Sequence, residues 1–399
     1  MRHCSRELLK VFTNVTLLLC IIIFTVVKFW DIDTKHFEID DKLALNDALH
    51  QYRYLIDNQI QNIELVNYYK NIEHSNKKLM NYLAYASSET NNTMISFLNK
   101  NVKPNTFHSH NDYTRQMPLF EALSLGLTSI EADVWLGTDN QRLSVAHRET
   151  DLLNYPLRDL NDLYTEPLLT MLNDVNEIYE HFDYNSNTTT IAKKGLYHES
   201  ENRTMFLVID FKSEDSSQTY TRLMDTYLKP FIENDFITFF NITSNEMSWR
   251  PITVILTGNK PTDLSIIDKD SETDKIGYLG DSKRYVFPEQ MLDNLTNLDE
   301  SSKTFVASTS FSKLCMACDI SPWKVILRGK LPARGLRCFK KFIDDAHANN
   351  LKTRIWGVPK SLLGFSKNFW RQQIDDLGVD FINVDHLSRV LSYPNYDHN

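Results

Sequence analysis

Short β-rich runs alternate with helical stretches from Pro104 almost to the C-terminus, over about 290 residues. Alternation of this kind is typical of a parallel sheet flanked by helices, because parallel strands need a long crossover connection, usually a helix. The length fits an α/β fold of the eight-stranded (β/α)8 TIM barrel type. The expected strands are Thr106–His108, Ser129–Leu136, Leu143–His147, Met205–Phe211, Ile252–Thr257, Phe305–Ser308, Thr353–Val358 and Asp380–Val384, and amphipathic segments include Leu119–Leu125, Leu336–Asn349 and Phe369–Leu377.

The N-terminus has the pattern of a membrane-directed segment. A basic tail, residues 1–10, precedes an apolar run at 11–27, which is short for a bilayer span and is followed by Trp30. A cleaved signal peptide should end in small residues, whereas this run ends Val26-Val27-Lys28, so the pattern favours a signal anchor over a signal peptide or a buried helix. Basic residues before the run and acidic residues after it place the rest of the chain beyond the membrane.

Residues 28–103 read as a helical and linker extension without recognisable chemistry, and residues 104–395 as the barrel. Five Asn-X-Ser/Thr sequons beyond the apolar run permit a glycoprotein in the lumen of the secretory pathway, anchored or secreted, and do not exclude mitochondrial association. Cys315 and Cys318 form a CxxC pair followed by Cys338. No second pair completes a zinc site, which favours a disulfide or buried thiols.

The charge balance argues against nucleic acid as a partner. Forty-three basic and fifty-two acidic side chains give a net charge of −9, whereas a nucleic-acid binder usually presents a basic face. The chain also has no Gly-rich dinucleotide loop and no Walker sequence, which argues against a nucleotide cofactor.

Six polar residues lie in or just after the expected strands, toward their C-terminal ends. The C-terminal ends of parallel barrel strands open onto one face, where active sites of this fold are built. Alternation points Glu131 and Asp133 to the same side, and likewise Asp210 and Lys212. The six candidates are His108, Glu131, Asp133, His147, Asp210 and Lys212.

Three carboxylates meeting at one mouth would repel each other unless a cation lay among them. Oxygen-only ligation favours a hard ion, Mg²⁺ or Ca²⁺, over zinc, and two nearby histidines could act as base and acid near neutral pH. Each residue alone has a structural interpretation, since Glu131 and Asp133 could be salt-bridged and Asp210 could pair with Lys212. Their order along consecutive strands favours the site.

At these residues the sequence resembles the superfamily of glycerophosphodiester phosphodiesterases and phosphatidylinositol phospholipase C-like barrels. The pattern is a histidine in the first strand, Glu-X-Asp in the second, a further histidine, an acidic-X-Lys strand and a terminal Gly378-Val379-Asp380. Residues 104–390 carry the likeness. It is closest to the fungal "altered inheritance of mitochondria protein 6" family, at His108–Tyr113, Glu131–Trp135, Ile209–Ser213, Val254–Asn259 and Thr353–Gly357.

The resemblance implies a phosphoric diester hydrolase of the lipid-metabolism type. Glu131, Asp133 and Asp210 would hold one divalent ion, His108 and His147 would form the acid–base pair, and Lys212 would bind a phosphate oxygen. The substrate would be a glycerophosphodiester or a (lyso)phospholipid head group. Ser109-His110 and Arg148 depart from the glycerophosphodiesterase pattern, and Asp210 stands where many members have Glu, which leaves the head group open.

Two other interpretations remain open. His108-Ser109-His110 resembles the His-X-His opening of amidohydrolase and PHP-type hydrolases, which bind several metals and need more histidines at later strand ends; His386, beside Asp385, fits such a place. The chain could also be a non-catalytic, membrane-anchored barrel that binds a lipid or sugar phosphate, because fold does not fix function.

Overall fold

The structure is a computed structural model that describes residues 93–99, 102–115, 118–138, 140–154, 159–180, 192–268, 275–295, 304–358, 366–387 and 390. The expected N-terminal tail, the 11–27 segment and residues 28–92 of the extension therefore lie outside the described residues. A search of the described helices finds none that is both long and apolar enough to span a bilayer.

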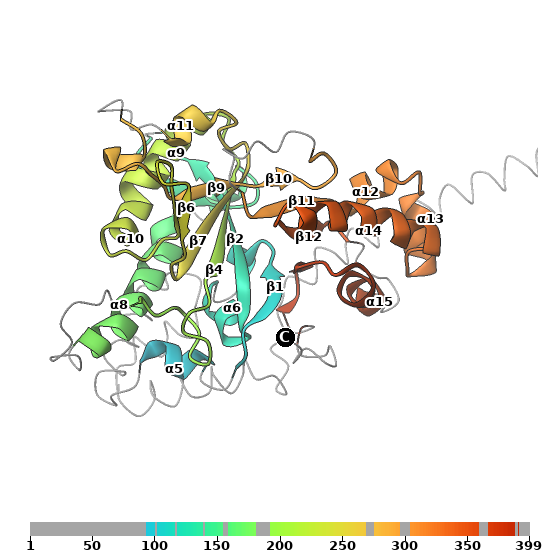
Figure 1. Ribbon diagram of the computed structural model, residues 1–399, viewed down its shortest axis with the longest axis horizontal. Coiled ribbons are helices and arrows are strands. Elements are labelled where there is room, and N and C mark those ends of the chain that lie inside the picture. Colours follow the sequence, from blue (N-terminus) through green and yellow to red (C-terminus); the bar gives the residue numbers. More distant parts are fainter. Residues whose placement is uncertain are drawn as a thin grey trace, which may run out of the picture. The chain divides into compact units, whose positions relative to one another are not determined.

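The described strands form an α/β barrel, which confirms the expected fold class (Figure 1). Nine strands follow one another by parallel pairing, and β1 pairs with β13. In chain order along the barrel they are β1 (Asn105–Ser109), β2 (Leu127–Leu136), β4 (Met205–Phe211), β7 (Ile252–Gly258), β9 (Val286–Pro288), β10 (Gln290–Met291), β11 (Val306–Ser310), β12 (Lys352–Trp356) and β13 (Phe381–Val384).

Nine strands occupy eight positions, because β9 and β10 are two halves of one position. Only Glu289 separates them. β9 pairs with β7, β10 pairs with β11, and the Glu289 amide continues the ladder by donating to the Leu256 carbonyl. The sequence analysis missed this position, since the run is short and interrupted by Pro288, which cannot donate to a ladder.

The expected third strand is not a barrel strand. β3 (Leu143–Val145) pairs antiparallel with the end of β2, Val134 opposite Val145. The connection from Leu136 to Leu143 is far too short for the crossover that parallel neighbours require. The hairpin nevertheless returns the chain to the end of β2, and so it brings His147 to the mouth of the barrel.

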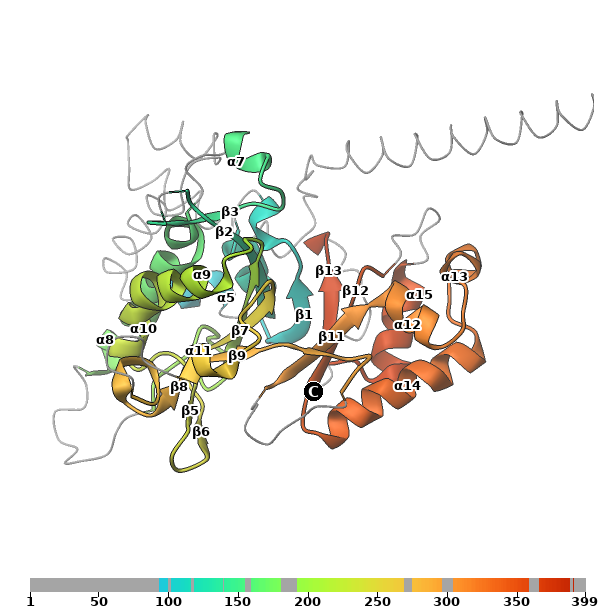
Figure 2. The same cartoon turned by 90° about the horizontal axis from the view of Figure 1, so that it is seen from above.

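Helices connect and cover the strands (Figure 2). The segments before β4 are α5 (Met94–Asn99), η1 (Asp112–Thr114), α6 (Phe120–Ser124), α7 (Asp151–Asn154), η2 (Asn161–Thr165) and α8 (Glu166–Glu180). After β4 come α9 (Ser216–Arg222), η3 (Leu223–Leu228), α10 (Lys229–Glu233), α11 (Leu264–Asp268), η4 (Tyr278–Gly280), α12 (Phe311–Ala317), α13 (Pro322–Arg328), α14 (Ala333–Ala348), α15 (Ser366–Arg371) and η6 (Gln372–Leu377). A separate antiparallel sheet contains β5 (Phe239–Asn241), β6 (Glu246–Ser248) and β8 (Lys283–Arg284).

The barrel interior changes from apolar to polar along the strands. Phe206, Val208 and Asp210 occupy alternate positions of β4, so they point to the same side. Phe206 packs edge-on against Phe381 of β13, with ring centroids 5.1 Å apart, in a buried cluster that includes Phe287. The apolar cluster fills the end where the strands begin, and the polar residues lie where they finish.

A disulfide joins Cys318, just after α12, to Cys338 in α14, and Cys315 is a buried free thiol. The two cysteines are 20 residues apart, and a crosslink that closes a loop of this length should add about 3 kcal/mol to the free energy of unfolding.

We expect Cys338→Ser to lower the free energy of unfolding by about that amount, measured by denaturant titration. Cys315→Ala is the control, since it removes no crosslink. An unchanged unfolding midpoint on reduction of the wild type would contradict the pairing.

Candidate active site

The three acidic candidates come together at the C-terminal end of the barrel. Glu131 and Asp133 project from β2 and Asp210 from β4, where Asp133 and Asp210 are paired neighbours in the ladder. Each offers an oxygen such that the three atoms lie within 4.8 Å of one another. Within the described residues this is the single such cluster of possible metal ligands. The alternation expected from the sequence is the reason for the convergence.

Asp133 and Asp210 share Lys212 as a partner, and each keeps one carboxylate oxygen without a hydrogen bond among the described residues. Lys212 Nζ lies 3.0 Å from Asp133 Oδ2 and donates to Asp210 Oδ2 at 2.7 Å, and Tyr113 donates to Asp133 Oδ2 at 2.8 Å. The Oδ1 atoms of both aspartates are buried without a hydrogen-bond partner among the described residues. Burial and the neighbouring Asp133 raise the pKa of Asp210 to about 6, although Lys212 opposes the shift.

These features fit a divalent cation. A buried carboxylate oxygen without a partner carries a desolvation cost that a bound ion would remove. The donor set is oxygen-only, which suits Mg²⁺ or Ca²⁺.

His147 stands beside Asp133, as the sequence analysis expected of a site residue. Its Nδ1 is 3.1 Å from Asp133 Oδ2 and 3.3 Å from the Tyr113 hydroxyl, and its side chain is 55% exposed. His147 and Lys212 line an open cleft of about 530 Å³ together with Trp135, Arg148, Glu149, Asp210, Phe211, Gly258 and Asn259.

His108 is wholly buried inside the barrel. Arg354 of β12 donates to its Nε2 at 2.8 Å, and its Nδ1 contacts Ser129 Oγ at 2.7 Å. Because a guanidinium can only donate, Nε2 is an acceptor and the ring is neutral. Burial, reinforced by Arg354, lowers the pKa of His108 to about 4.

His110, two residues later, lies at the mouth of the barrel. Its Nδ1 is 2.7 Å from Asp385 Oδ1 and its Nε2 is 3.6 Å from Glu131 Oε2, and the side chain is 25% exposed. Burial opposes protonation, but Glu131 and Asp385 raise the pKa of His110 above its ordinary value. From the sequence, His110 was a departure from the glycerophosphodiesterase pattern and part of the His-X-His of the multi-metal interpretation, and it was not predicted as a member of the acid–base pair.

The loop that carries His110 is held by two buried charged residues. Arg115 donates to the carbonyls of His110, Val384 and Asp385, which ties the end of β1 to the end of β13. Asp112 accepts from the Ser109 hydroxyl, the Leu119 amide and the Tyr164 hydroxyl. These bonds fix His110 against Asp385.

A buried ion network lies beneath the carboxylates. Arg354 is 3% exposed and contacts Glu131 Oε1 at 3.4 Å and Glu289 Oε1 at 3.2 Å. Burial would raise the pKa of Glu131, but His110 and Arg354 hold it well below its usual range. Sequence reasoning missed both Arg354 and Glu289. A charged residue inside the β-rich run Thr353–Val358 was the available signal for Arg354, whereas Glu289 lies between β9 and β10, at the barrel position that was not predicted.

Other motif residues lie elsewhere. Asp380, of the terminal Gly-Val-Asp, precedes β13 and accepts from the Thr353 amide and from His347 at 2.8 Å, at the end where the strands begin. His198 is paired with the neighbouring Glu199. Neither His198 nor His347 belongs to the acidic cluster, so neither supplies the additional ligands that the multi-metal interpretation needs.

The comparisons with known proteins agree with this geometry. A family model described as an AIM6-like phosphodiesterase domain matches residues 96–276, a stretch that contains the acidic cluster, Lys212, His110 and His147. The chain therefore contains an α/β barrel, the first part of which matches a phosphodiesterase-like domain.

More specifically, the chain belongs to the altered inheritance of mitochondria protein 6 family. It is 40% identical over 324 residues to the member from Kluyveromyces lactis, a match that covers 77% of each chain. It is 42% identical over 299 residues to the Saccharomyces cerevisiae member, covering 75% of this chain and 73% of the relative. The Lachancea thermotolerans member is 42% identical over 298 residues, with 73% and 66% covered.

Proposed function

We propose that this protein is a metal-dependent phosphoric diester hydrolase that cleaves a glycerophosphodiester or a (lyso)phospholipid head group. The observation that carries the proposal is the cluster of Glu131, Asp133 and Asp210, with two partnerless buried oxygens, flanked by His110, His147 and Lys212. The phosphodiesterase family match supports the reaction class.

The carboxylates would hold one Mg²⁺ or Ca²⁺, which would supply charge neutralisation at a phosphate oxygen. Lys212 lies between Asp133 and Asp210, and its ammonium group would bind a second phosphate oxygen. Tyr113 fixes the orientation of the Asp133 carboxylate through its hydroxyl hydrogen bond. The open cleft of about 530 Å³ would receive the head group.

Proton transfer needs one group on each side of the phosphate, a base and an acid. His147 contacts Asp133 and is the second member of the pair expected from the sequence. For the first member, the geometry favours His110 over His108. His110 is held by Asp385 at the mouth, whereas both ring nitrogens of His108 already have partners inside the barrel. In this assignment His108 positions Glu131 through Arg354.

We expect His110→Gln to lower phosphodiester turnover by about 10²- to 10⁴-fold with little change in stability, because an acid–base group is removed. Asp385→Asn should give a smaller loss, since the ring loses only its orienting carboxylate. His347→Gln is the matched control: it also pairs with an aspartate at 2.8 Å, at the opposite end of the strands. Steady-state kinetics of the purified full-length chain checks this. Wild-type turnover in His110→Gln would overturn the assignment.

The reaction and its substrate are tested with purified full-length protein depleted of metal by EDTA. Glycerophosphocholine, glycerophosphoinositol, lysophosphatidylcholine and bis-p-nitrophenyl phosphate are each supplied with Mg²⁺, with Ca²⁺ or with neither. We expect turnover to return when the ion is added to the metal-depleted protein, and to be lost in Lys212→Met. Saturable binding of a head-group phosphate without turnover of any substrate would favour the non-catalytic, phosphate-binding alternative.

We propose an oxidising compartment beyond a membrane as the location of the barrel. The Cys318–Cys338 disulfide supports this, because such bonds persist in oxidising compartments. The relatives' name refers to the inheritance of mitochondria, so fractionation should follow mitochondrial as well as secretory-pathway membranes. Cys318 and Cys338 found reduced in freshly alkylated cells would contradict this location.

A further inference from the structure

Two short helices, α12 and α13, carry large apolar side chains in solvent. Leu327 is 80% exposed, Trp323 72% and Met316 66%. Trp323 and Leu327 are four residues apart in α13 and therefore share one face, while Val325 of the same helix is buried and faces the protein. Single exposed apolar residues are ordinary, but three on adjacent helices mark an interaction surface.

The same segment is strongly basic, in contrast to the chain as a whole. From Phe311 to Lys341 there are eight Lys or Arg and one acidic residue, Asp319, whereas the whole chain has a net charge of −9. Lys324 and Arg328 form the stripe next to Trp323 and Leu327 on α13. The exposed basic residues include Lys313, Lys324, Arg328, Lys330, Arg334 and Arg337.

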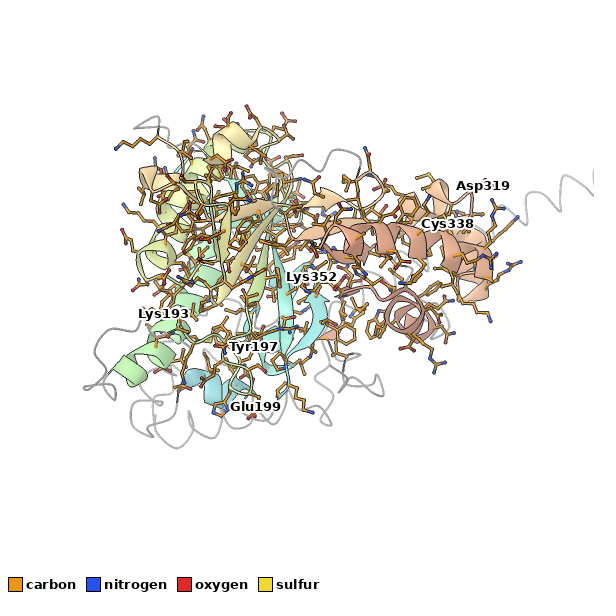
Figure 3. The ribbon with its side chains drawn as sticks, in the orientation of Figure 1. Lys193, Tyr197, Glu199, Asp319, Cys338 and Lys352 are labelled. Atoms are coloured by element: carbon orange, nitrogen blue, oxygen red, sulfur yellow. A yellow bond between two sulfur atoms is a disulfide. The ribbon has the colours of Figure 1, made fainter. Side chains whose placement is uncertain are left out.

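The first helix of this basic-apolar surface begins at the end of the barrel where the carboxylates lie. α12 begins at Phe311, directly after the C-terminal end of β11, and α14 returns the chain toward the start of β12. Trp356, 39% exposed, ends β12 and is paired with Ser310, the residue before α12. Figure 1 shows α12, α13 and α14 (orange) beyond β11 and β12. Figure 3 shows that Asp319 and Cys338 lie at that end, where the disulfide holds α12 to α14.

We propose that the surface formed by Met316, Trp323 and Leu327 with Lys313, Lys324 and Arg328 docks on an anionic phospholipid membrane. Helices that lie in a membrane interface combine Trp and Leu on one face with Lys and Arg beside it, and Trp favours the head-group level. Each basic side chain near an anionic membrane strengthens partitioning by about fivefold. The inference stands independently of the proposed reaction.

The test uses the full-length chain in vesicles whose acyl chains carry bromine, which quenches indole emission on contact. We expect Trp323→Phe to remove part of the quenched emission in mixed phosphatidylcholine and phosphatidylserine vesicles. Trp249→Phe, at an exposed tryptophan between β6 and β7, is the control and should remove only unquenched emission. Any tryptophan close to the apolar N-terminal segment, such as Trp30, is common to all the variants.

The electrostatic part is tested in the same assay. Lys324→Gln with Arg328→Gln should abolish most of the Trp323 quenching, as should high salt or pure phosphatidylcholine vesicles. Equal quenched fractions in Trp323→Phe and wild type would overturn the proposal. Quenching of Trp323 that does not depend on the charge of the lipid would also overturn it. A dimer in sedimentation that depends on Trp323 without vesicles would identify a second copy, not a membrane, as the partner. Circular dichroism confirms the fold of each variant.

Discussion

Gly258→Ala is expected to disable the active site without unfolding the barrel. Gly258 ends β7 with a φ of +68°, and a Cβ there would overlap Asp210 Oδ1 and meet the Phe211 carbonyl at 2.5 Å. The added methyl must displace the Asp210 carboxylate, and displacements of about 1 Å at a catalytic group can cost about 100-fold in rate. We therefore expect about a 100-fold loss of phosphodiester turnover and weaker binding of the divalent ion.

Gly357→Ala is the matched control for that loss. Gly357 follows β12 with a nearly identical φ of +65°, but among the described residues a Cβ there would meet no heavy atom within 4 Å beyond its chain neighbours. Both variants put Ala in a left-handed backbone conformation, which should lower the free energy of unfolding by about 1–2 kcal/mol, measured by thermal unfolding. Only Gly258→Ala should lose activity. Equal kinetic losses in the two variants would show that backbone strain, not the position of Asp210, is responsible.

Among the variants proposed for this protein, Arg354→Met is expected to lower the free energy of unfolding most, by about 3–5 kcal/mol. It removes the buried cation between Glu131 and Glu289 and leaves both buried carboxylates without the positive charge that they share. Chemical denaturation of the wild type and the variant measures the difference. Turnover should also fall, since Arg354 orients Glu131 and contacts His108.

Two further variants separate the destabilisation by Arg354→Met from the loss of any positive charge. Lys340→Met breaks the exposed pair with Asp344, at 2.6 Å in α14, and should cost no more than about 1 kcal/mol. Adding Glu289→Gln to Arg354→Met should recover part of the stability, because one unpaired buried charge is removed. A double variant less stable than Arg354→Met alone would contradict the network.

Much of the fold follows from periodicity in the sequence. β4 was predicted with its observed bounds, and Glu131, Asp133 and Asp210 were placed together because alternation and strand direction determine where they point. The barrel position shared by β9 and β10 was not found, since a run divided by Pro288 and Glu289 lacks a strand's usual length. β3 was mistaken for a barrel strand, although its short connection to β2 permits only a hairpin.

The resemblance assigned His108 to the acid–base pair, and nothing in the local sequence pattern weighs it against its neighbour His110. His108 and His110 are both near the end of β1, and their roles depend on partners hundreds of residues away: Arg354 inside the barrel and Asp385 at its rim. Such long-range pairs are visible only once the barrel closes. The basic residues between Lys313 and Lys341 become informative only beside the exposed apolar residues of α12 and α13, whose exposure the sequence does not reveal.

The central claim is that Glu131, Asp133 and Asp210 form a divalent-metal centre on which phosphodiester cleavage depends. The most direct measurement titrates the metal-free full-length chain with Mg²⁺ and with Ca²⁺, recording bound ion by calorimetry and turnover of bis-p-nitrophenyl phosphate in parallel. The account predicts one ion per chain, with turnover rising over the same concentration range, and neither in Asp133→Asn. Undiminished turnover in the EDTA-treated protein, or a full ion complement in Asp133→Asn, would contradict it.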